Sequence, residues 1–224
     1  MTLGAGARRG RFIVFEGPEG AGKSTQIRLL KERLEAAGGS PLLTREPGGT
    51  RAGEAIRNVL LDPDHEIAPL AEFLLYSAAR SQHVHEVIAP ALAQGRDVLC
   101  DRFTGASVAY QGYGRGLDLQ LIRDLNHKVT GGLVPDRTLL LDLDVRRGLE
   151  RAAARAAKDR LEAAGMEFHQ RTRAGFLEQA RTDPSWVLIS ADSDEKSVAA
   201  AVWRAVEDLL DEHPRPQRQP EGQA

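Results

Sequence analysis

Five short runs of apolar residues recur along the chain, and longer segments with a helical spacing of apolar and polar positions lie between them. The runs cover residues 12–15, 41–44, 97–100, 138–142 and 186–190. Short runs that are apolar throughout are typical of strands in a parallel sheet covered by helices on both faces. We therefore expect five buried strands.

The spacing of apolar residues in the intervening segments predicts helices. Their ranges are 23–37, 51–61, 69–94, 117–130, 145–163, 166–182 and 194–212. Strands that alternate with helices indicate βαβ units, in which the crossover helices cover both faces of the sheet. The pattern therefore predicts an α/β fold with a doubly wound, five-stranded parallel sheet flanked by helices.

The 224 residues suit one domain rather than two, and we place it at 11–213. Residues 1–10 include basic side chains but no apolar core of a signal peptide, so we expect a flexible extension there. Residues 214–224 are prolines, glycine and polar residues with no large apolar side chain, which predicts a disordered tail.

Composition and charge exclude several classes of protein. The formal net charge is −2, so no overall basic field favours nucleic acid or an anionic membrane. No apolar run is long enough to cross a bilayer, and we expect a cytoplasmic protein without membrane partners. Cys100 is the single cysteine and lies in an apolar run, so we interpret it as a core residue.

A glycine-rich segment, Gly-Pro-Glu-Gly-Ala-Gly-Lys-Ser at 17–24, joins the first predicted strand to the first predicted helix. This is the Walker A pattern in its required context, and it predicts a P-loop NTP hydrolase-like fold. Glycines let successive backbone N–H groups turn toward phosphate oxygens, Lys23 adds a full charge, and the Ser24 hydroxyl suits Mg²⁺. The alternative is a glycine-rich turn without a ligand. We expect the whole loop to bind ATP: Gly17, Pro18, Glu19, Gly20, Ala21, Gly22, Lys23, Ser24 and Thr25.

The strand predicted at 97–100 ends in Asp101-Arg102. Ligands of open α/β sheets bind beyond the carboxyl ends of the strands, so we expect both side chains near Lys23. Asp101 could hold Mg²⁺ together with Ser24, and Arg102 could bind a phosphate through its two-pronged guanidinium. An ion pair that merely closes the strand is an equal alternative for these two residues taken alone.

Three further segments accompany the Walker A loop: Thr-Arg-Glu-Pro-Gly-Gly-Thr at 44–50, Asp-Arg-Phe at 101–103 with Ala-Tyr-Gln-Gly at 109–112, and an arginine-rich segment at 151–162. With them the chain resembles the thymidylate kinase family of P-loop nucleoside-monophosphate kinases, from about Arg11 to the last helix. The resemblance implies phosphorylation of dTMP to dTDP by ATP, a step of dTTP biosynthesis. It implies direct transfer with Mg²⁺, without a covalent enzyme intermediate, and a homodimer.

The resemblance also implies an acceptor site on the long third helix. Tyr76, where family members more often have Phe, would stack on thymine, and Arg80 would bind its carbonyl edge; Arg57 and Arg102 would hold the 5′-phosphate. The remaining dTMP contacts implied are Glu19, Glu46, Ser107, Tyr110 and Gln111, with Tyr110 placed where a ribose 2′-hydroxyl would intrude. From the residues alone, the alternatives are core packing for Tyr76, a solvated helix face for Arg57 and simple helix polarity for Ser107 and Gln111. Glu46 could instead serve only to orient arginine side chains.

Phosphoryl transfer also needs a cation that neutralises the moving group. In this family an arginine of the loop or of a segment called the lid provides it, and the loop here has none. The lid corresponds to 145–163, and we expect Arg155 to act in catalysis with Lys23, Asp101 and Arg102. Arg151 would bind ATP, and Arg160 would bind ligand or position the lid. A solvated basic helix is the alternative.

Two other functions compete with this interpretation. A deoxynucleoside kinase would have little use for Arg57 and Arg102, because its acceptor carries no phosphate. A GTP-binding switch would carry an Asn-Lys-x-Asp segment, which the sequence lacks. We interpret the scattered histidines as surface or helix-face residues without metal-ligand spacing: His65, His83, His85, His127 and His169.

Overall fold

The computed structural model describes residues 9–154, 160–161 and 164–211. Its five strands form one parallel sheet in the order β2-β3-β1-β4-β5. They are β1 (Phe12–Glu16), β2 (Leu42–Arg45), β3 (Val98–Asp101), β4 (Arg137–Asp142) and β5 (Trp186–Ser190). Each lies within one residue of its predicted range, and the predicted fold class is confirmed.

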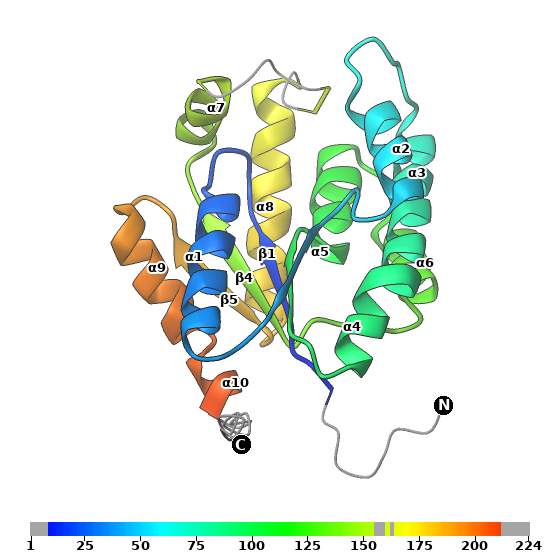
Figure 1. Ribbon diagram of the computed structural model, residues 1–224. Helices are drawn as coiled ribbons and strands as arrows, with labels where there is room; N and C mark the ends of the chain where they lie inside the picture. Colours follow the sequence, from blue (N-terminus) through cyan, green and yellow to red (C-terminus); the bar gives the residue numbers. More distant parts are fainter. Residues whose placement is uncertain (1–8, 155–159, 162–163, 212–224) are drawn as a thin grey trace, which may run out of the picture.

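The central strand β1 sits where the chain changes direction across the sheet. The chain builds β2 and β3 on one side of β1 and then crosses to β4 and β5 on the other (Figure 1). In the β1–β3 pair, Phe15 lies opposite Asp101, so the two strands end side by side. The loop after β1 and the residues after β3 therefore meet at the topological switch point, where ligands of this fold class bind.

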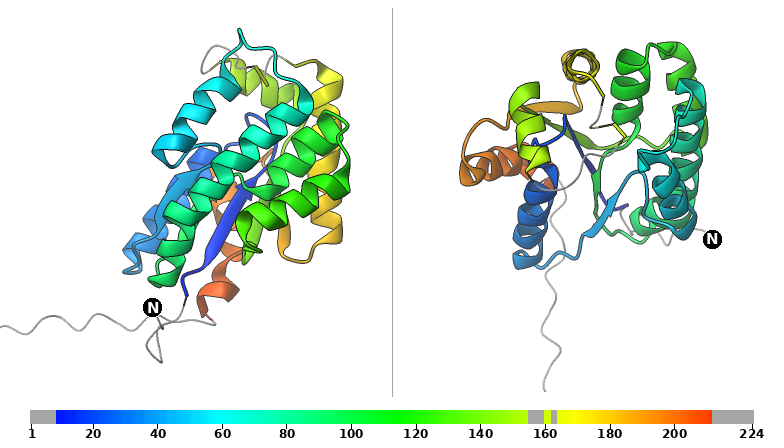
Figure 2. Two further views of the ribbon diagram at one scale, coloured as in Figure 1. Left: turned by 90° about the vertical axis from the view of Figure 1, so that its right-hand side faces the viewer. Right: turned by 90° about the horizontal axis from the view of Figure 1, so that it is seen from above.

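Alternate side chains of the strands enter two separate cores, as the two-residue period of a strand requires. Ile13 and Phe15 face α1 (Lys23–Ala36) and α9 (Glu195–Arg204). Phe12 and Val14 face η1 (Val84–Ile88) and α4 (Ala89–Ala93) on the opposite side. The helix α8 (Met166–Thr182) covers β4 and β5 on that second side (Figure 2).

The remaining helices stand mostly on the second side of the sheet. They are α2 (Arg51–Leu61), α3 (Pro69–His83), α5 (Thr104–Ser107), η2 (Val108–Gly114), α6 (Leu119–Thr130), α7 (Val145–Ala153) and α10 (Glu207–Asp211). The ranges of α2 and α8 match the prediction, and α1 and α6 differ from it by at most two residues.

Three predicted helices require correction. The segment 69–94 is not uniform: α3 passes through the π-helix η1 into α4, where Pro90 has no N–H to donate. Of the helix predicted over 145–163, α7 covers Val145–Ala153, residues 155–159 and 162–163 lie outside the described residues, and Leu161 packs into the core. The helix predicted over 194–212 breaks between α9 and α10, because the chain turns there to bury Val206.

The helical segment formed by α5 and η2, which follows β3, is absent from the predicted ranges. Its sequence, Thr-Gly-Ala-Ser-Val-Ala-Tyr-Gln-Gly-Tyr-Gly, is rich in glycine and has no clear apolar stripe. Ala109 and Tyr110 of this segment pack against Phe168 and Phe176 of α8. Tertiary packing therefore decides its conformation where local periodicity does not.

The described part of the chain begins with residues that already contact the domain. Arg9 forms an ion pair with Asp136, and the backbone N–H of Gly10 donates to Leu92 O. Among the described residues, no helix has the length and apolar character needed to span a membrane.

Candidate active site

The Walker A loop turns tightly between β1 and α1. Gly20 has a φ of 70°, and a Cβ there would collide with the backbone of Gly148 in α7. A side chain would thus strain the loop and also force α7 away from it. The loop that we predicted to hold phosphate is in this way packed beneath the first helix of the lid (Figure 1).

Lys23 is buried at the start of α1 and points back over the loop. Its Nζ donates to Gly17 O at 3.1 Å and to Pro18 O at 2.9 Å. Burial, and then the charge of Arg102, lower the pKa of Lys23, while Glu19, Asp101 and Glu16 oppose that shift. The ammonium therefore already lies inside the cradle where the β and γ phosphates of a nucleotide would sit.

Ser24 and Asp101 come together as predicted for a metal pair. The Ser24 Oγ lies 3.4 Å from Asp101 Oδ2. Asp101 Oδ1 is buried and has no hydrogen-bond partner among the described residues. A carboxylate oxygen left free beside a hydroxyl fits a Mg²⁺ ion with its bound waters, because Mg²⁺ takes oxygen ligands and keeps several waters.

Arg102 links the end of β3 to the Walker A loop. It is the one described non-glycine residue with a positive φ, 71°, and its guanidinium donates to Gly17 O at 3.0 Å and to Glu19 Oε1 at 2.7 Å. The Tyr110 hydroxyl donates to the same Glu19 oxygen at 2.8 Å. Residues expected at the donor and acceptor sites thus form one hydrogen-bonded cluster.

Glu19 is ionised within that cluster. Burial alone would raise its pKa, but Arg102, then Lys23 and the Tyr110 hydroxyl, outweigh burial and lower the pKa to about 2. The loop therefore presents a fixed negative charge that holds Arg102 in place before a substrate binds.

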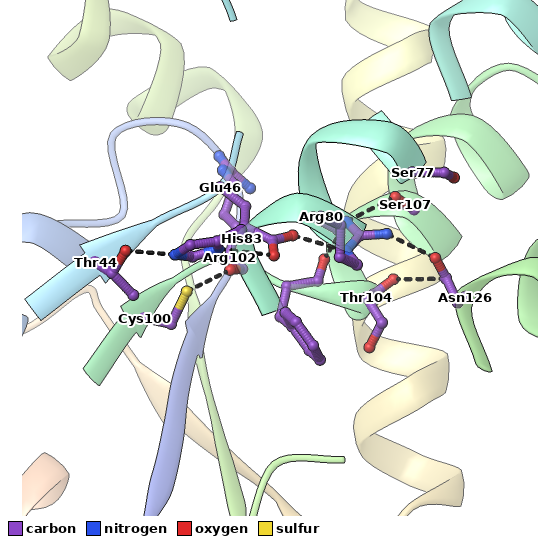
Figure 3. A network of polar contacts seen from close by, with 12 residues as sticks. Thr44, Glu46, Ser77, Arg80, His83, Cys100, Arg102, Thr104, Ser107 and Asn126 are labelled. Carbon is purple, nitrogen blue, oxygen red and sulfur yellow. Dashed lines mark hydrogen bonds and ion pairs between the residues drawn. The ribbon is translucent and has the colours of Figure 1, made fainter. Parts of the chain in front are cut away.

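Arg80 lies at the centre of a buried polar network (Figure 3). Its Nε donates to Glu46 at 2.7 Å and its Nη1 to Asn126 at 2.6 Å. Its Nη2 donates to Phe103 O at 3.0 Å and to Ser107 Oγ at 3.1 Å. A guanidinium has five N–H groups, and these four bonds leave one N–H on Nη1 without a hydrogen-bond partner among the described residues.

His83 extends the same network and corrects its interpretation as a surface residue. It is fully buried, with Nε2 2.6 Å from Thr44 Oγ1 and Nδ1 3.1 Å from Glu46 Oε1. His169 of α8 is also buried. Glu46, expected near dTMP, is here the carboxylate that orients Arg80, and the peptide bond between Glu46 and Pro47 is cis.

The other predicted acceptor residues gather around α3 and η2. Tyr76 is half-buried against the cluster that contains Tyr110, and the Gln111 amide donates to Glu72 Oε1 at 2.9 Å. Arg57 of α2 donates to Pro47 O at 3.0 Å, which places it beside the turn that carries Glu46.

The described arginines of the lid contact two different parts of the molecule, the loop after β5 and the helices α2 and α3. Arg151 Nη1 lies 3.4 Å from Ala191 O in the loop after β5. Arg160 donates to Leu60 O at 2.8 Å and forms an ion pair of 2.5 Å with Glu72. Arg155 lies outside the described residues.

Four residues of the region were not predicted from the sequence. Glu72, fully buried, accepts from Gln111, Arg115 and Arg160. Glu16 accepts hydrogen bonds from the segment 103–106, and Asn126 accepts one from Arg80. His83 lies at hydrogen-bonding distance from Glu46. Buried acidic residues within apolar runs, as at 16 and 72, were the available signal.

A parallel sheet with a Walker A loop at its switch point, and a second arginine-lined site beside it, defines a P-loop nucleotide kinase. The family model of thymidylate kinase matches residues 15–202. The thymidylate kinase of Deinococcus radiodurans is 54% identical over 199 residues, which cover 88% of this chain and 97% of that protein. The chain therefore belongs to the thymidylate kinase family and is a phosphotransferase.

Two further relatives agree. The thymidylate kinase of Pelotomaculum thermopropionicum is 50% identical over 207 residues, covering 91% of this chain and 95% of that protein. The crystal structure of thymidylate kinase from Ehrlichia chaffeensis superposes with a TM-score of 0.74, at 36% identity, over 89% of this chain and 99% of that one. The family resemblance inferred from the sequence motifs is confirmed.

Proposed function

We propose that this chain transfers the γ-phosphoryl group of ATP to dTMP, giving ADP and dTDP, and that the residues described above carry the reaction. The single observation behind the residue roles is the cluster in which Arg102 and Tyr110 are hydrogen-bonded to Glu19 of the Walker A loop. It brings the residues for the donor and the acceptor within one hydrogen bond of each other, as direct transfer requires.

On the donor side, the backbone N–H groups of 17 and 19–25 and the Lys23 ammonium would bind the β and γ phosphates. Ser24 and Asp101 would hold Mg²⁺, which neutralises phosphate charge when bound. Arg151, near Ala191 O, would lie against the nucleotide on the adenine side. Arg155 keeps its proposed role as the cation that stabilises the transferring group.

On the acceptor side, Tyr76 would stack on thymine, and the free N–H of Arg80 would donate to the base. Arg57 and Arg102 would bind the 5′-phosphate, for which Arg102 would exchange its bond to Glu19. Ser107, Tyr110 and Gln111 would line the same site, with Tyr110 against the sugar edge.

The test is a panel of acceptors with ATP and Mg²⁺. We expect kcat/KM for dTMP to exceed that for dUMP by roughly ten- to a few-hundred-fold, because one methyl group in a shaped apolar pocket gives that range. UMP should be very poor, and uncharged thymidine should not be phosphorylated. A preference for CMP, GMP or AMP would overturn the substrate, and a preference for thymidine would favour a nucleoside kinase.

We also propose a homodimer. Helices α2, α3 and α6 lie side by side (Figure 2) and carry Val59, Leu70, Leu74 and Leu121, each between 40% and 49% exposed. Exposed large apolar residues on adjoining helices are typical of a subunit interface. In a dimer with two-fold symmetry, the same helices of a second copy would cover these residues.

A further inference from the structure

Glu16 is a fully buried carboxylate that none of the proposed roles uses. It is the last residue of β1 and immediately precedes the Walker A loop. Its Oε1 accepts a hydrogen bond from Phe103 N and another from Ala106 N, each at 2.9 Å. A buried carboxylate is costly unless it is satisfied, so a residue of this kind at the edge of a site needs a physical explanation.

Phe103 is the residue before α5, and Ala106 lies in the first turn of that helix, where its N–H also donates to Phe103 O at 3.2 Å. A helix leaves its first N–H groups without intrahelical partners, and a Ser, Thr, Asp or Asn at the cap position usually binds them. Here the cap residue is Phe103, whose side chain has no acceptor. Glu16, from another element, takes the place of the missing cap.

The capped segment carries the acceptor residues. The chain continues from α5 into η2, and together they hold Ser107, Tyr110 and Gln111. Gly105 fits tightly at the first turn: a Cβ there would lie 2.6 Å from the Trp186 ring and 3.1 Å from Glu16 Oε1. The start of the segment is thus held between Glu16 and Trp186.

The cap depends on the reach of the side chain more than on its charge. Burial raises the pKa of Glu16 to about 7, against the opposing effect of Arg102, the two backbone N–H groups and Lys23. Its Oε2 has no hydrogen-bond partner among the described residues, and Glu16 is one of the residues that line a cavity of about 520 Å³. One oxygen makes both cap bonds, and an amide oxygen accepts N–H groups equally well.

We propose that Glu16 is a positioning residue, which caps α5 and so fixes the dTMP-binding side chains relative to the Walker A loop. This inference rests on the proposed placement of Ser107, Tyr110 and Gln111 at the acceptor. Because Glu16 is covalently joined to Gly17, the end of the donor loop and the start of the acceptor segment are connected through a single side chain.

Three substitutions separate reach from charge. Glu16→Gln keeps the length and one acceptor oxygen but removes the charge, and we expect kcat/KM for dTMP within about three-fold of wild type. Glu16→Asp keeps the charge but is one methylene short, and Glu16→Ala removes the acceptor. For both we expect kcat/KM for dTMP to fall about ten-fold or more, because the buried Phe103 N–H loses its partner and the Ala106 N–H keeps only its longer bond to Phe103 O.

Two readouts exclude a merely structural role. The KM for dTMP should rise about ten-fold in Glu16→Asp and Glu16→Ala, while the KM for ATP changes by less than about three-fold. A smaller folded fraction would instead lower kcat and leave both KM values unchanged. Amide hydrogen exchange at Phe103 and Ala106 should be faster in Glu16→Asp and unchanged in Glu16→Gln. This second readout needs no activity.

Asp136→Ala is the matched control, because the Asp136 carboxylate accepts from Phe12 N at 2.6 Å at the opposite end of β1. Its KM for dTMP should stay at the wild-type value. A Glu16→Asp protein with wild-type kcat/KM, or a Glu16→Gln protein as impaired as Glu16→Ala, overturns the cap. A wild-type protein that does not phosphorylate dTMP overturns the proposed function instead, and hydrogen exchange then still decides on the cap.

Discussion

At the scale of single residues, two arginines of the acceptor region are paired with carboxylates in different ways. The Arg80–Glu46 pair is buried, with side chains 1% and 4% exposed, and each member has further partners. The Arg102–Glu19 pair is more open, at 15% and 22% exposed. Breaking a buried pair leaves an uncompensated charge, so Arg80 is held as a fixed donor, while Arg102 is free to exchange a carboxylate for a phosphate.

Lys23 gives the most direct test of the donor site. In Lys23→Ala we expect kcat to fall by at least about 10²–10³-fold, because a preorganised charge on the transferring phosphate is lost. A coupled assay for ADP measures this, and thermal unfolding serves as the check that the fold survives. Near-normal turnover in the folded variant would contradict the proposed role of the loop.

The lowered pKa of Glu19 predicts the direction in which the stability of the protein changes with pH. Its pKa of about 2 in the folded protein lies below the ordinary value of 4.5. A depressed pKa contributes stability that is present above about pH 4.5 and is lost as the pH falls toward 2. The stability of wild type relative to Glu19→Gln, from urea unfolding, should therefore be constant from pH 7 to 5 and should shrink between pH 4.5 and 2.5.

The control for this prediction is Glu32→Gln on the exposed face of α1. Glu32 forms an i,i+4 pair with Arg28 in which both side chains are more than half exposed. Such surface pairs contribute little to stability. If the stability difference between wild type and Glu19→Gln instead grew as the pH fell below 4.5, the Arg102 pairing would not hold Glu19 ionised.

At the scale of elements, the sequence predicts what neighbouring residues determine. The Walker A loop, its strand and its helix are contiguous, and the pattern at 17–24 indicates all three. The segment α5–η2 is different, because its first turn is capped by Glu16, 87 residues away from Phe103 in the sequence. Because the cap comes from a residue on another strand, the local pattern of apolar and polar residues cannot predict it.

The same distinction between local motifs and long-range contacts holds for the candidate site. Motifs indicated Lys23 and Arg102 because their spacing belongs to known phosphate chemistry. Asn126 and Glu72 are single polar residues on amphipathic helices, and only the packing of α6 and α3 brings them to Arg80 and Gln111. The sequence records their identity but not the residues that they face.

The lid, the segment 145–163, connects two places that the structure describes. Arg151 of α7 lies near the loop after β5, and Arg160 is anchored to Glu72 of α3 and to Leu60 O of α2. Glu72 also orients the Gln111 amide. Arg151 is therefore attached on the side that we propose for ATP, and Arg160 on the side that we propose for dTMP.

From this arrangement we expect the three lid arginines to differ in their effects. Arg155→Ala should lower kcat by about 10³-fold or more with little change in the KM for dTMP, since it removes the transition-state cation. Arg160→Ala should mainly raise the KM for dTMP, because it removes one partner of the buried Glu72. Steady-state kinetics with varied dTMP at saturating ATP measures both. If Arg155→Ala keeps its kcat while Arg151→Ala loses it, the catalytic cation is Arg151.

At the scale of the whole molecule, the doubly wound sheet separates the sites that we propose for the two substrates. Helices α1 and α9 and the loop after β5 stand on the side we propose for ATP, while α2, α3 and η2 stand on the side we propose for dTMP (Figures 1 and 2). β1 and β3 end between the two sides, so Lys23 and Arg102 lie at the border. Helices α2, α3 and α6 carry the exposed apolar residues that we propose as the dimer interface.

That surface provides the last prediction. Burying a leucine side chain contributes about 1.5–3 kcal/mol, so four exposed aliphatic residues on adjoining helices can stabilise a dimer. Light scattering at micromolar concentration should report about twice the chain mass of 24.4 kDa. The double variant Leu70→Glu/Leu74→Glu places like charges across a two-fold axis and should be monomeric. Leu188→Glu, at a residue 54% exposed on β5, is the control and should remain dimeric. A wild-type protein that is monomeric at every concentration, or a double variant that still dimerises, would place the interface elsewhere or remove it.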